Sequence, residues 1–169
     1  MRLTAVVESQ TALTTGVNAT TTFNGYFAAW VAASAANFKL RRLKLGVRGP
    51  AGSVTSDQHT VALYRQTVRA AGTGLSNQVA LNLDQRGSAD VTSGLDFTTA
   101  ATAGTNGPTL AATATEKLTM NTQTSWDVPW DYIEDFIIDQ GTANGIGLVN
   151  IGNALPSSHL FVATATVEA

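Results

Sequence analysis

Apolar and polar residues alternate with a period of two along most of the chain, which indicates strands that are buried on one face. In the clearest stretch, Thr60–Thr67, Val61 and Leu63 alternate with Ala62 and Tyr64. Gly, Asn and Pro residues between such stretches supply turns. The other candidate strands cover residues 2–8, as a strand or an extended arm, 79–83, 95–99, 116–120, 131–139, 145–151 and 159–167. This pattern predicts an all-β fold, a sandwich or a barrel of about eight strands.

One segment, residues 26–37, fits two structures equally well. It is rich in alanine, and Phe27, Trp30 and Phe38 share one face at helical spacing. The segment is either a short helix or a strand followed by a turn of small residues.

The stretch Phe38–Arg48 predicts a long strand with an irregularity. Leu40 lies one residue out of phase with Leu43 and Leu45. A β-bulge at positions 41 and 42 restores a single apolar face, because a bulge inserts one extra residue. The opposite face then carries a basic strip made of Lys39, Arg41, Arg42, Lys44 and Arg48.

Size and composition fit one domain that binds rather than reacts. The chain has 169 residues and no cysteine, which excludes disulfides and thiolate metal sites. Charged residues make up 13% and the net charge is −2, so no strong field favours nucleic acid or a membrane surface. No apolar run is long enough for a membrane-spanning helix, and the first residues do not resemble a secretory signal. Residues 100–115 are low in complexity and predict a long loop.

Motifs for catalysis are missing from the sequence. The two histidines, His59 and His159, are far apart, and neither a Gly-x-Ser-x-Gly elbow nor a phosphate-binding loop occurs. Gly145 and Gly147 lie in a strand pattern, where glycine indicates a neighbouring backbone or aromatic ring packed close by. We therefore predict no enzyme activity, no cofactor and no metal.

Five carboxylates lie close together in the last third of the chain. We expect a solvated strand facing the basic strip, with ion pairs across strands. A glycosidase site is the alternative, and it requires two of these carboxylates about 5–9 Å apart in one cleft. The five residues are Asp127, Asp131, Glu134, Asp135 and Asp139.

Two surface features are candidates for contact with a partner. The basic strip suits either a solvated sheet face or docking to an acidic protein. Trp126 and Trp130 flank Pro129, which predicts a sheet edge or a corner; their use is core packing or an aromatic platform. The candidate partner-binding residues are Arg2, Lys39, Arg41, Arg42, Lys44, Arg48, Trp126 and Trp130.

The C-terminal third resembles a family of viral structural proteins. Residues 125–130, 134–138 and 141–153, followed by a closing strand to Val167, are similar to the end of jelly-roll decoration (cement) proteins and minor capsid proteins of tailed phages. Residues 40–47 and 61–65 fit the same layout. The resemblance implies an eight-stranded jelly roll, often trimeric, that stabilises the shell from outside. It also implies that residues 1–22 form an arm or first strand, ahead of a single sandwich domain at 23–169.

These observations favour a virion protein that is made in the host cytoplasm and decorates the capsid. Its expected partners are the major capsid protein and further copies of itself in a trimer, with no nucleic acid, membrane or small-molecule substrate. A tail, baseplate or head-fibre component, or a glycan- or receptor-binding module, is the alternative. Trp126 and Trp130 exposed together in a groove would favour that alternative.

Overall fold

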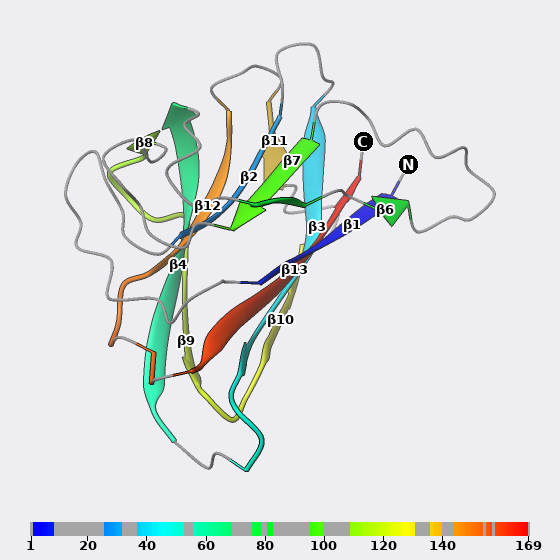
Figure 1. The fold of residues 1–169 in the computed structure, drawn as a ribbon. Helices are drawn as coiled ribbons and strands as arrows, with labels where there is room; N and C mark the ends of the chain where they lie inside the picture. The colour runs from blue at the N-terminus through cyan, green and yellow to red at the C-terminus, as the bar shows by residue number, and fades with distance from the viewer. Residues whose placement is uncertain are drawn as a thin grey trace.

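The computed structural model describes a two-sheet, all-β arrangement (Figure 1). The described residues are 2–8, 26–31, 37–52, 56–68, 76–78, 81–82, 95–99, 109–130, 136–139, 144–153, 155–156 and 158–168. These residues contain strands and no helix, as expected for a β-sandwich. The predicted fold class is therefore confirmed at this level.

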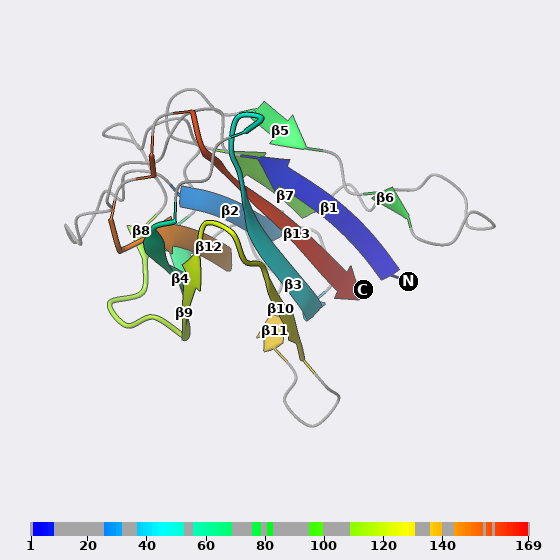
Figure 2. The same cartoon turned by 90° about the horizontal axis from the view of Figure 1, so that it is seen from below.

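The first sheet, called sheet I, contains both ends of the described chain. Its strand order is β10 (Trp126–Pro129), β3 (Phe38–Arg48), β13 (Leu160–Glu168), β1 (Arg2–Glu8) and β6 (Leu81–Asn82). A further strand, β11 (Phe136–Ile138), pairs with β3 beyond the end of β10. The long neighbours β1, β13 and β3 lie side by side in Figure 2.

The second sheet, sheet II, packs against the first. Its strand order is β5 (Ser76–Gln78), β7 (Leu95–Thr99), β2 (Tyr26–Val31), β12 (Gly145–Asn150), β4 (Gln58–Val68) and β8 (Thr109–Leu110). Strand β9 (Glu116–Asn121) also pairs with β4, next to β8. All pairings in both sheets are antiparallel.

The bulge predicted in β3 is present. Arg42 pairs with Thr166 and Leu40 with Val167, so Arg41 is the extra residue between two regular pairs. Leu40, Leu43 and Leu45 are consequently all buried on one face, although they are out of phase in the sequence.

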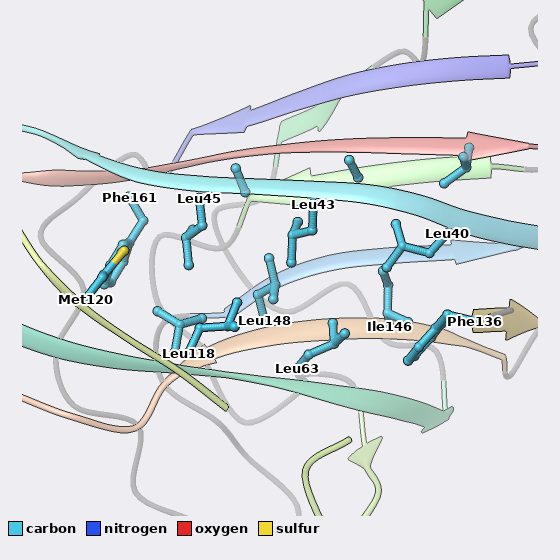
Figure 3. Close-up of a cluster of buried hydrophobic side chains, with 14 of the residues drawn as sticks. Leu40, Leu43, Leu45, Leu63, Leu118, Met120, Phe136, Ile146, Leu148 and Phe161 are labelled. Atoms are coloured by element: carbon cyan, nitrogen blue, oxygen red, sulfur yellow. The ribbon is translucent and has the colours of Figure 1, made fainter. Parts of the chain in front are cut away.

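The core lies between the two sheets, as Figure 3 shows. Sheet I contributes β3 leucines and the alternating residues of β13, whose burial switches at every position. Sheet II contributes Val61 and Leu63 from β4 and Ile146 and Leu148 from β12. Each such side chain stabilises the fold by roughly 1.5–3 kcal/mol when it leaves water.

The outer face of sheet II is also covered. Ala62, Tyr64 and Val149 are buried there, although they alternate with the core residues. Gly147 lies under Leu110, and a Cβ atom at Gly147 would come within 2.9 Å of the leucine Cδ2. The close neighbour predicted for this glycine therefore exists, and it is an aliphatic side chain rather than a backbone or a ring.

The structure decides between alternatives that the sequence left open, and it changes one predicted element. Residues 26–31 form a strand rather than a helix, whereas 32–36 lie outside the described residues. The predicted loop at 100–115 contains β8, and the amides of Ala111 and Thr115 donate to carbonyls of β4. Residues 2–8 pair with β13 along their whole length, whereas 9–22 are not described. Of the predicted strand 131–139, residues 136–138 are a strand, and 131–135 are not described.

Candidate partner-binding surface

The basic strip occupies the outer face of sheet I. Arg42, Lys44 and Arg48 are exposed and alternate with the buried leucines of β3, whereas Lys39 is half-buried. Arg41 projects from the bulge to Glu168, a residue in register with Lys39. The structure therefore brings the five predicted cations onto one face, as the alternation indicated.

Carboxylates on neighbouring strands neutralise part of this strip. The Arg41 Nε donates to Glu168 Oε2 at 2.6 Å, with the arginine side chain only 10% exposed. The Arg42 Nε donates to Asp127 Oδ1 at 2.6 Å, and its Nη2 donates to the other carboxylate oxygen. This two-point geometry fixes the arginine better than a single contact does.

The Arg42–Asp127 pair also sets the protonation of its carboxyl group. The hydrogen bonds and positive charge of Arg42, with a smaller contribution from Lys44, hold the pKa of Asp127 below its ordinary value. The same pair raises the pKa of Arg42. Asp127 therefore stays ionised and acts as an ion-pair partner of the strip, which fits the predicted contact between the acidic and basic segments.

Arg2 lies in the same sheet as the strip. It is the first residue of β1 and is in register with Glu168, which in turn is in register with Lys39. These three positions form a row across β1, β13 and β3.

The two tryptophans lie at the open edge of the sandwich. Trp126 is in register with buried Leu45, and its indole Nε1 donates to the carbonyl of Thr119 at 2.7 Å. This bond joins β10 in sheet I to β9 in sheet II. Trp126 nevertheless remains 39% exposed. Pro129 ends β10 at the sheet edge, as predicted.

Trp130 packs against the core rather than standing free. Its ring meets Phe136 edge-on at 5.9 Å between centroids, and its amide donates to the carbonyl of Arg41 at 2.9 Å. Trp126 and Trp130 therefore serve different neighbours, and only Trp126 is well exposed.

A shallow open groove of about 360 Å³ crosses the outer face of sheet I. Gly46 lies midway along its β3 wall and adds no side chain. Lys44 and Arg48 lie two residues before and after this glycine, so all three share one face. The remaining lining comes from β3, from β10 with the residue before it, and from β13. It consists of Leu45, Val47, Ser125, Trp126, Asp127, Val162 and Thr164.

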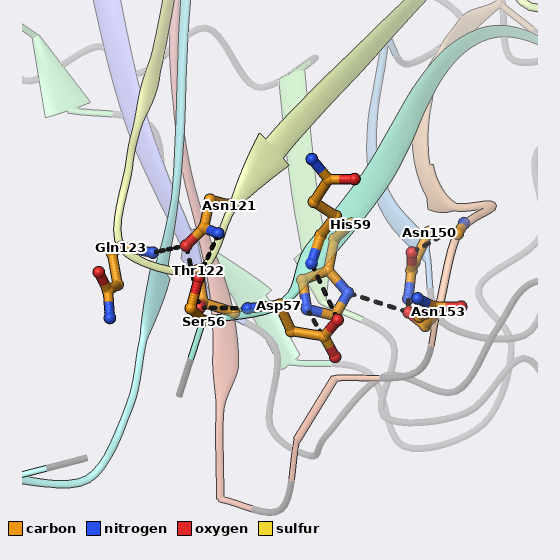
Figure 4. A network of polar contacts seen from close by, with 10 residues as sticks. Ser56, Asp57, His59, Asn121, Thr122, Gln123, Asn150 and Asn153 are labelled. Atoms are coloured by element: carbon orange, nitrogen blue, oxygen red, sulfur yellow. Dashed lines mark hydrogen bonds and ion pairs between the residues drawn. The ribbon is translucent and has the colours of Figure 1, made fainter. Parts of the chain in front are cut away.

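A polar network at one end of the sandwich was not predicted (Figure 4). His59 is fully buried, in phase with Val61, and its Nδ1 lies 3.0 Å from the carbonyl of Asn153. A carbonyl can only accept, so Nδ1 carries the proton. The Asn150 amide donates to the same carbonyl at 2.8 Å. The sequence did offer a signal for the burial of His59, because it lies two residues before Val61 and so falls on the buried face of the strand.

The same network fastens the loop before β4 to the turn after β9. Asp57 and Thr122 exchange bonds through their backbones and the Thr122 hydroxyl, at 2.9 and 3.2 Å. The Asn121 amide donates to Ser56 at 2.7 Å, and its oxygen accepts from the amide of Gln123. These contacts hold loops in place, and we assign them a structural role.

The described residues contain no arrangement typical of a metal or membrane site. No group of three or more His, Asp or Glu side chains among them would hold a metal ion. No helix in the part of the chain that the structure describes is long and apolar enough to cross a membrane. Of the five clustered carboxylates, Asp127 is paired and Asp139 is exposed, whereas Asp131, Glu134 and Asp135 lie outside the described residues.

Comparisons of the chain with protein-family models, with curated proteins and with solved structures give no match. The assignment of a function therefore depends on the fold and on the surface described above.

Proposed function

We propose that this chain is a virion structural protein that decorates a capsid by binding alone. In this proposal, the fold is a jelly roll and the partner is the major capsid protein. The outer face of sheet I, with the basic strip at its centre, is the docking surface. The protein acts on the outside of the shell as a homotrimer.

The order of strand pairing is the observation that carries the proposal. Strands pair from the two ends of the chain inwards: β1 with β13, β2 with β12, β3 with β10 and β4 with β9. The sheets then contain the orders β1-β13-β3-β10 and β2-β12-β4-β9. Such nesting is expected when one long antiparallel hairpin is rolled into two sheets, which is the arrangement of viral jelly rolls.

The surface supports a binding role on this fold. Jelly rolls serve many functions, so the argument for docking must come from the site. The outer face of sheet I carries ion pairs that hold Arg41 and Arg42 in place before any partner arrives. Ordered side chains lose less conformational entropy on binding. Many copies on a lattice then need only modest contacts each.

Co-sedimentation with undecorated capsids of the same virus tests this proposal. We expect the purified protein to have the molar mass of a trimer and to pellet with capsids in stoichiometric amounts. Reversing the charges of Lys44 and Arg48 to Glu should abolish pelleting, because rim charges steer docking. Lys117→Glu, on exposed β9 of sheet II, is the matched control and should leave it intact. A monomer that ignores capsids would overturn the proposal.

A glycan-binding module is the second candidate, and one observation favours it. Trp126 is 39% exposed at the edge of the sandwich, and the exposed residues Ser125 and Asp127 beside it in the chain carry groups that can hydrogen-bond to sugar hydroxyls. Trp130 does not join it, because that ring packs on Phe136. A saturable change in tryptophan fluorescence with bacterial surface polysaccharides, lost in Trp126→Phe, would support this candidate. No change across such a panel would remove it.

A further inference from the structure

Strand β9 forms an edge of sheet II. It pairs with β4 over its whole length, and no second strand among the described residues pairs with it. The amide of Thr122 donates to the carbonyl of Asp57, so this residue and every second residue before it direct their backbone groups towards β4. The backbone groups of Lys117, Thr119 and Asn121 therefore point away from the sheet, where an added strand would bind.

The turn after β9 and the strand that follows it already bond to two of these three residues. The Asn121 amide donates to the Thr124 hydroxyl at 3.2 Å, and the Asn121 carbonyl accepts from the Thr124 amide at 3.0 Å. The Thr119 carbonyl accepts from the Trp126 indole at 2.7 Å. Of the outward backbone groups of these residues, the amide of Thr119 and both groups of Lys117 remain for an incoming strand.

The strand that carries Trp126 holds its indole at this edge. Trp126 is in register with buried Leu45, so its side chain points from sheet I towards sheet II. The next residue, Asp127, is bonded to Arg42 through both carboxylate oxygens, which fixes β10 beside β3. The chain passes from β9 to β10 through a short turn between the two sheets (Figure 1). The donor that closes the edge of sheet II thus comes from sheet I.

A second copy of β9 would match the outward groups of the first. If two copies run antiparallel with Leu118 opposite Leu118, Lys117 of each lies opposite Thr119 of the other. Each such pair exchanges two hydrogen bonds, provided that the Thr119 carbonyl is available. No like charges lie directly opposite each other in this register. The contact is isologous, because both copies use the same patch.

The Trp126 indole interferes with half of these bonds. The Thr119 carbonyl of one copy is the acceptor for the Lys117 amide of the other. A carbonyl oxygen can accept a second bond, but the indole nitrogen at 2.7 Å already lies at the distance that an incoming amide would take. The bonds that are left contribute little net free energy in water, whereas association must offset the loss of translational and rotational freedom.

We propose that Trp126 prevents the edge of β9 from pairing with β9 of a second copy of this chain. Its indole occupies the acceptor that an added strand requires, and Thr124 has the same effect at Asn121. This role concerns contacts between copies and is independent of the partner that sheet I binds. An edge left open would lead to aggregation at high protein concentration.

Trp126→Phe tests this role because it keeps an aromatic ring and removes the donor. We expect sedimentation velocity to show association beyond the state of the parent protein, at concentrations about 10- to 100-fold lower than the parent requires, from the bonds regained. Hydrogen exchange should slow at the amides of Lys117 and Thr119 as copies associate. Trp130→Phe makes the same chemical change where the ring packs on Phe136, and it should leave association unchanged.

A proline at position 117 identifies the edge as the contact. The Lys117 amide points away from β4, so Lys117→Pro keeps the ladder between β4 and β9 and removes the donor to the Thr119 carbonyl of the other copy. Trp126→Phe combined with Lys117→Pro should return to the association state of the parent protein. If Trp126→Phe does not fold, Trp126→Met, which also lacks the donor, takes its place.

Three results would overturn the inference. One is an association state of Trp126→Phe equal to that of the parent protein. Another is equal association in Trp130→Phe, which would indicate a general loss of stability. The third is association of Trp126→Phe that persists after Lys117→Pro is added, which would place the contact elsewhere on the molecule.

Discussion

Three glycines differ in which atoms a side chain added at their position would meet. At Gly152 an added Cβ would meet the backbone amide nitrogen of Thr60 at 2.6 Å, which the sheet cannot easily move. At Gly147 it would meet the end of the Leu110 side chain at 2.9 Å, and that side chain can shift. At Gly46 the nearest atom is at 3.7 Å, an ordinary contact.

The three alanine substitutions should therefore differ in stability. We expect losses of about 2–3 kcal/mol for Gly152→Ala and about 1 kcal/mol for Gly147→Ala, as overpacking costs. Gly46→Ala should stay within about 0.5 kcal/mol, as is usual for surface substitutions. Equilibrium unfolding in urea measures all three. Equal losses at the three positions would contradict the contacts described.

The Arg42–Asp127 pair predicts a contribution to stability that depends on pH. The pKa of Asp127 is lower in the folded protein than its ordinary value, about 3.9 in an unfolded chain. The contribution is therefore complete above about pH 4–5 and is lost as pH falls through the lower folded value. Asp127→Asn should therefore reduce the dependence of the free energy of unfolding on pH in that acidic range, as measured by urea unfolding at a series of pH values.

Arg42→Gln serves as the matched partner in this test. It removes the hydrogen bonds and the charge that lower the pKa of Asp127. It should therefore reduce the pH dependence of the free energy of unfolding over the same acidic range. The double variant should show no further change, because both single changes remove one interaction. Two variants with additive effects would show that the groups act separately.

The sequence predicts the exposure of Arg42 better than it predicts the residue with which Arg42 pairs. The exposure of Arg42 and Lys44 follows from their alternation with buried leucines, a local property of β3. That Asp127 pairs with Arg42, and Glu168 with Arg41, depends on which strands lie beside β3. Partners 85 and 127 residues away leave no local pattern.

At the level of elements, single-residue deletions in β3 test the position of the bulge. Removing Arg41 should join Leu40 to Arg42 in regular pairing, because Arg41 is the unpaired extra residue. The cost is the ion pair with Glu168 and the bond from the Trp130 amide, together about 1–3 kcal/mol. Removing Lys44 from the regular part should instead turn one half of the strand over.

Chemical denaturation of the two deletion variants distinguishes these outcomes. We expect deletion of Lys44 to cost more than about 4 kcal/mol or to prevent folding, since buried leucines would face water. Arg41→Ala keeps the chain length and isolates the ion pair. If deletion of Arg41 harms the protein as much as deletion of Lys44, the bulge is not where the register places it.

Some elements were predictable and others were not, for physical reasons. The phase break between Leu40 and Leu43 is visible in the sequence, and it predicted the bulge. Leu110 is a lone leucine among Thr and Ala residues, so no alternation of apolar and polar residues could predict β8. Its burial depends on Gly147, which is distant in sequence. Residues 26–31 form a strand because β12 and β7 pair with them on both sides.

For the whole molecule, the sequence predicted the fold class but not the order of the strands. Alternation at many short segments was enough to predict an all-β fold, either a sandwich or a barrel. Which strands are neighbours depends on contacts across the length of the chain, such as Arg2 with Glu168. Such non-local pairing must close long loops before it is stabilised, so folding should take milliseconds to seconds. Stopped-flow fluorescence of the tryptophans measures this rate.

The N-terminal strand offers the sharpest test of the molecule as a whole. β1 pairs with β13 over seven residues, from Arg2–Glu168 to Glu8–Val162. Deleting residues 1–8 removes this ladder and leaves an open edge on β13. We expect a loss on the order of 3 kcal/mol in unfolding free energy and association through the bare edge. Urea unfolding and light scattering measure these effects.

Adding the missing segment back decides between a strand and a free arm. A synthetic peptide of residues 1–9 should restore stability by pairing with β13, whereas the same peptide with proline at position 5 should not, because proline removes a ladder donor. If the truncated protein unfolds at the same urea concentration as the full chain, residues 2–8 do not belong to the sandwich in solution. They would then be available as an arm to reach a neighbouring subunit, and their deletion should weaken the proposed trimer while leaving the monomer intact.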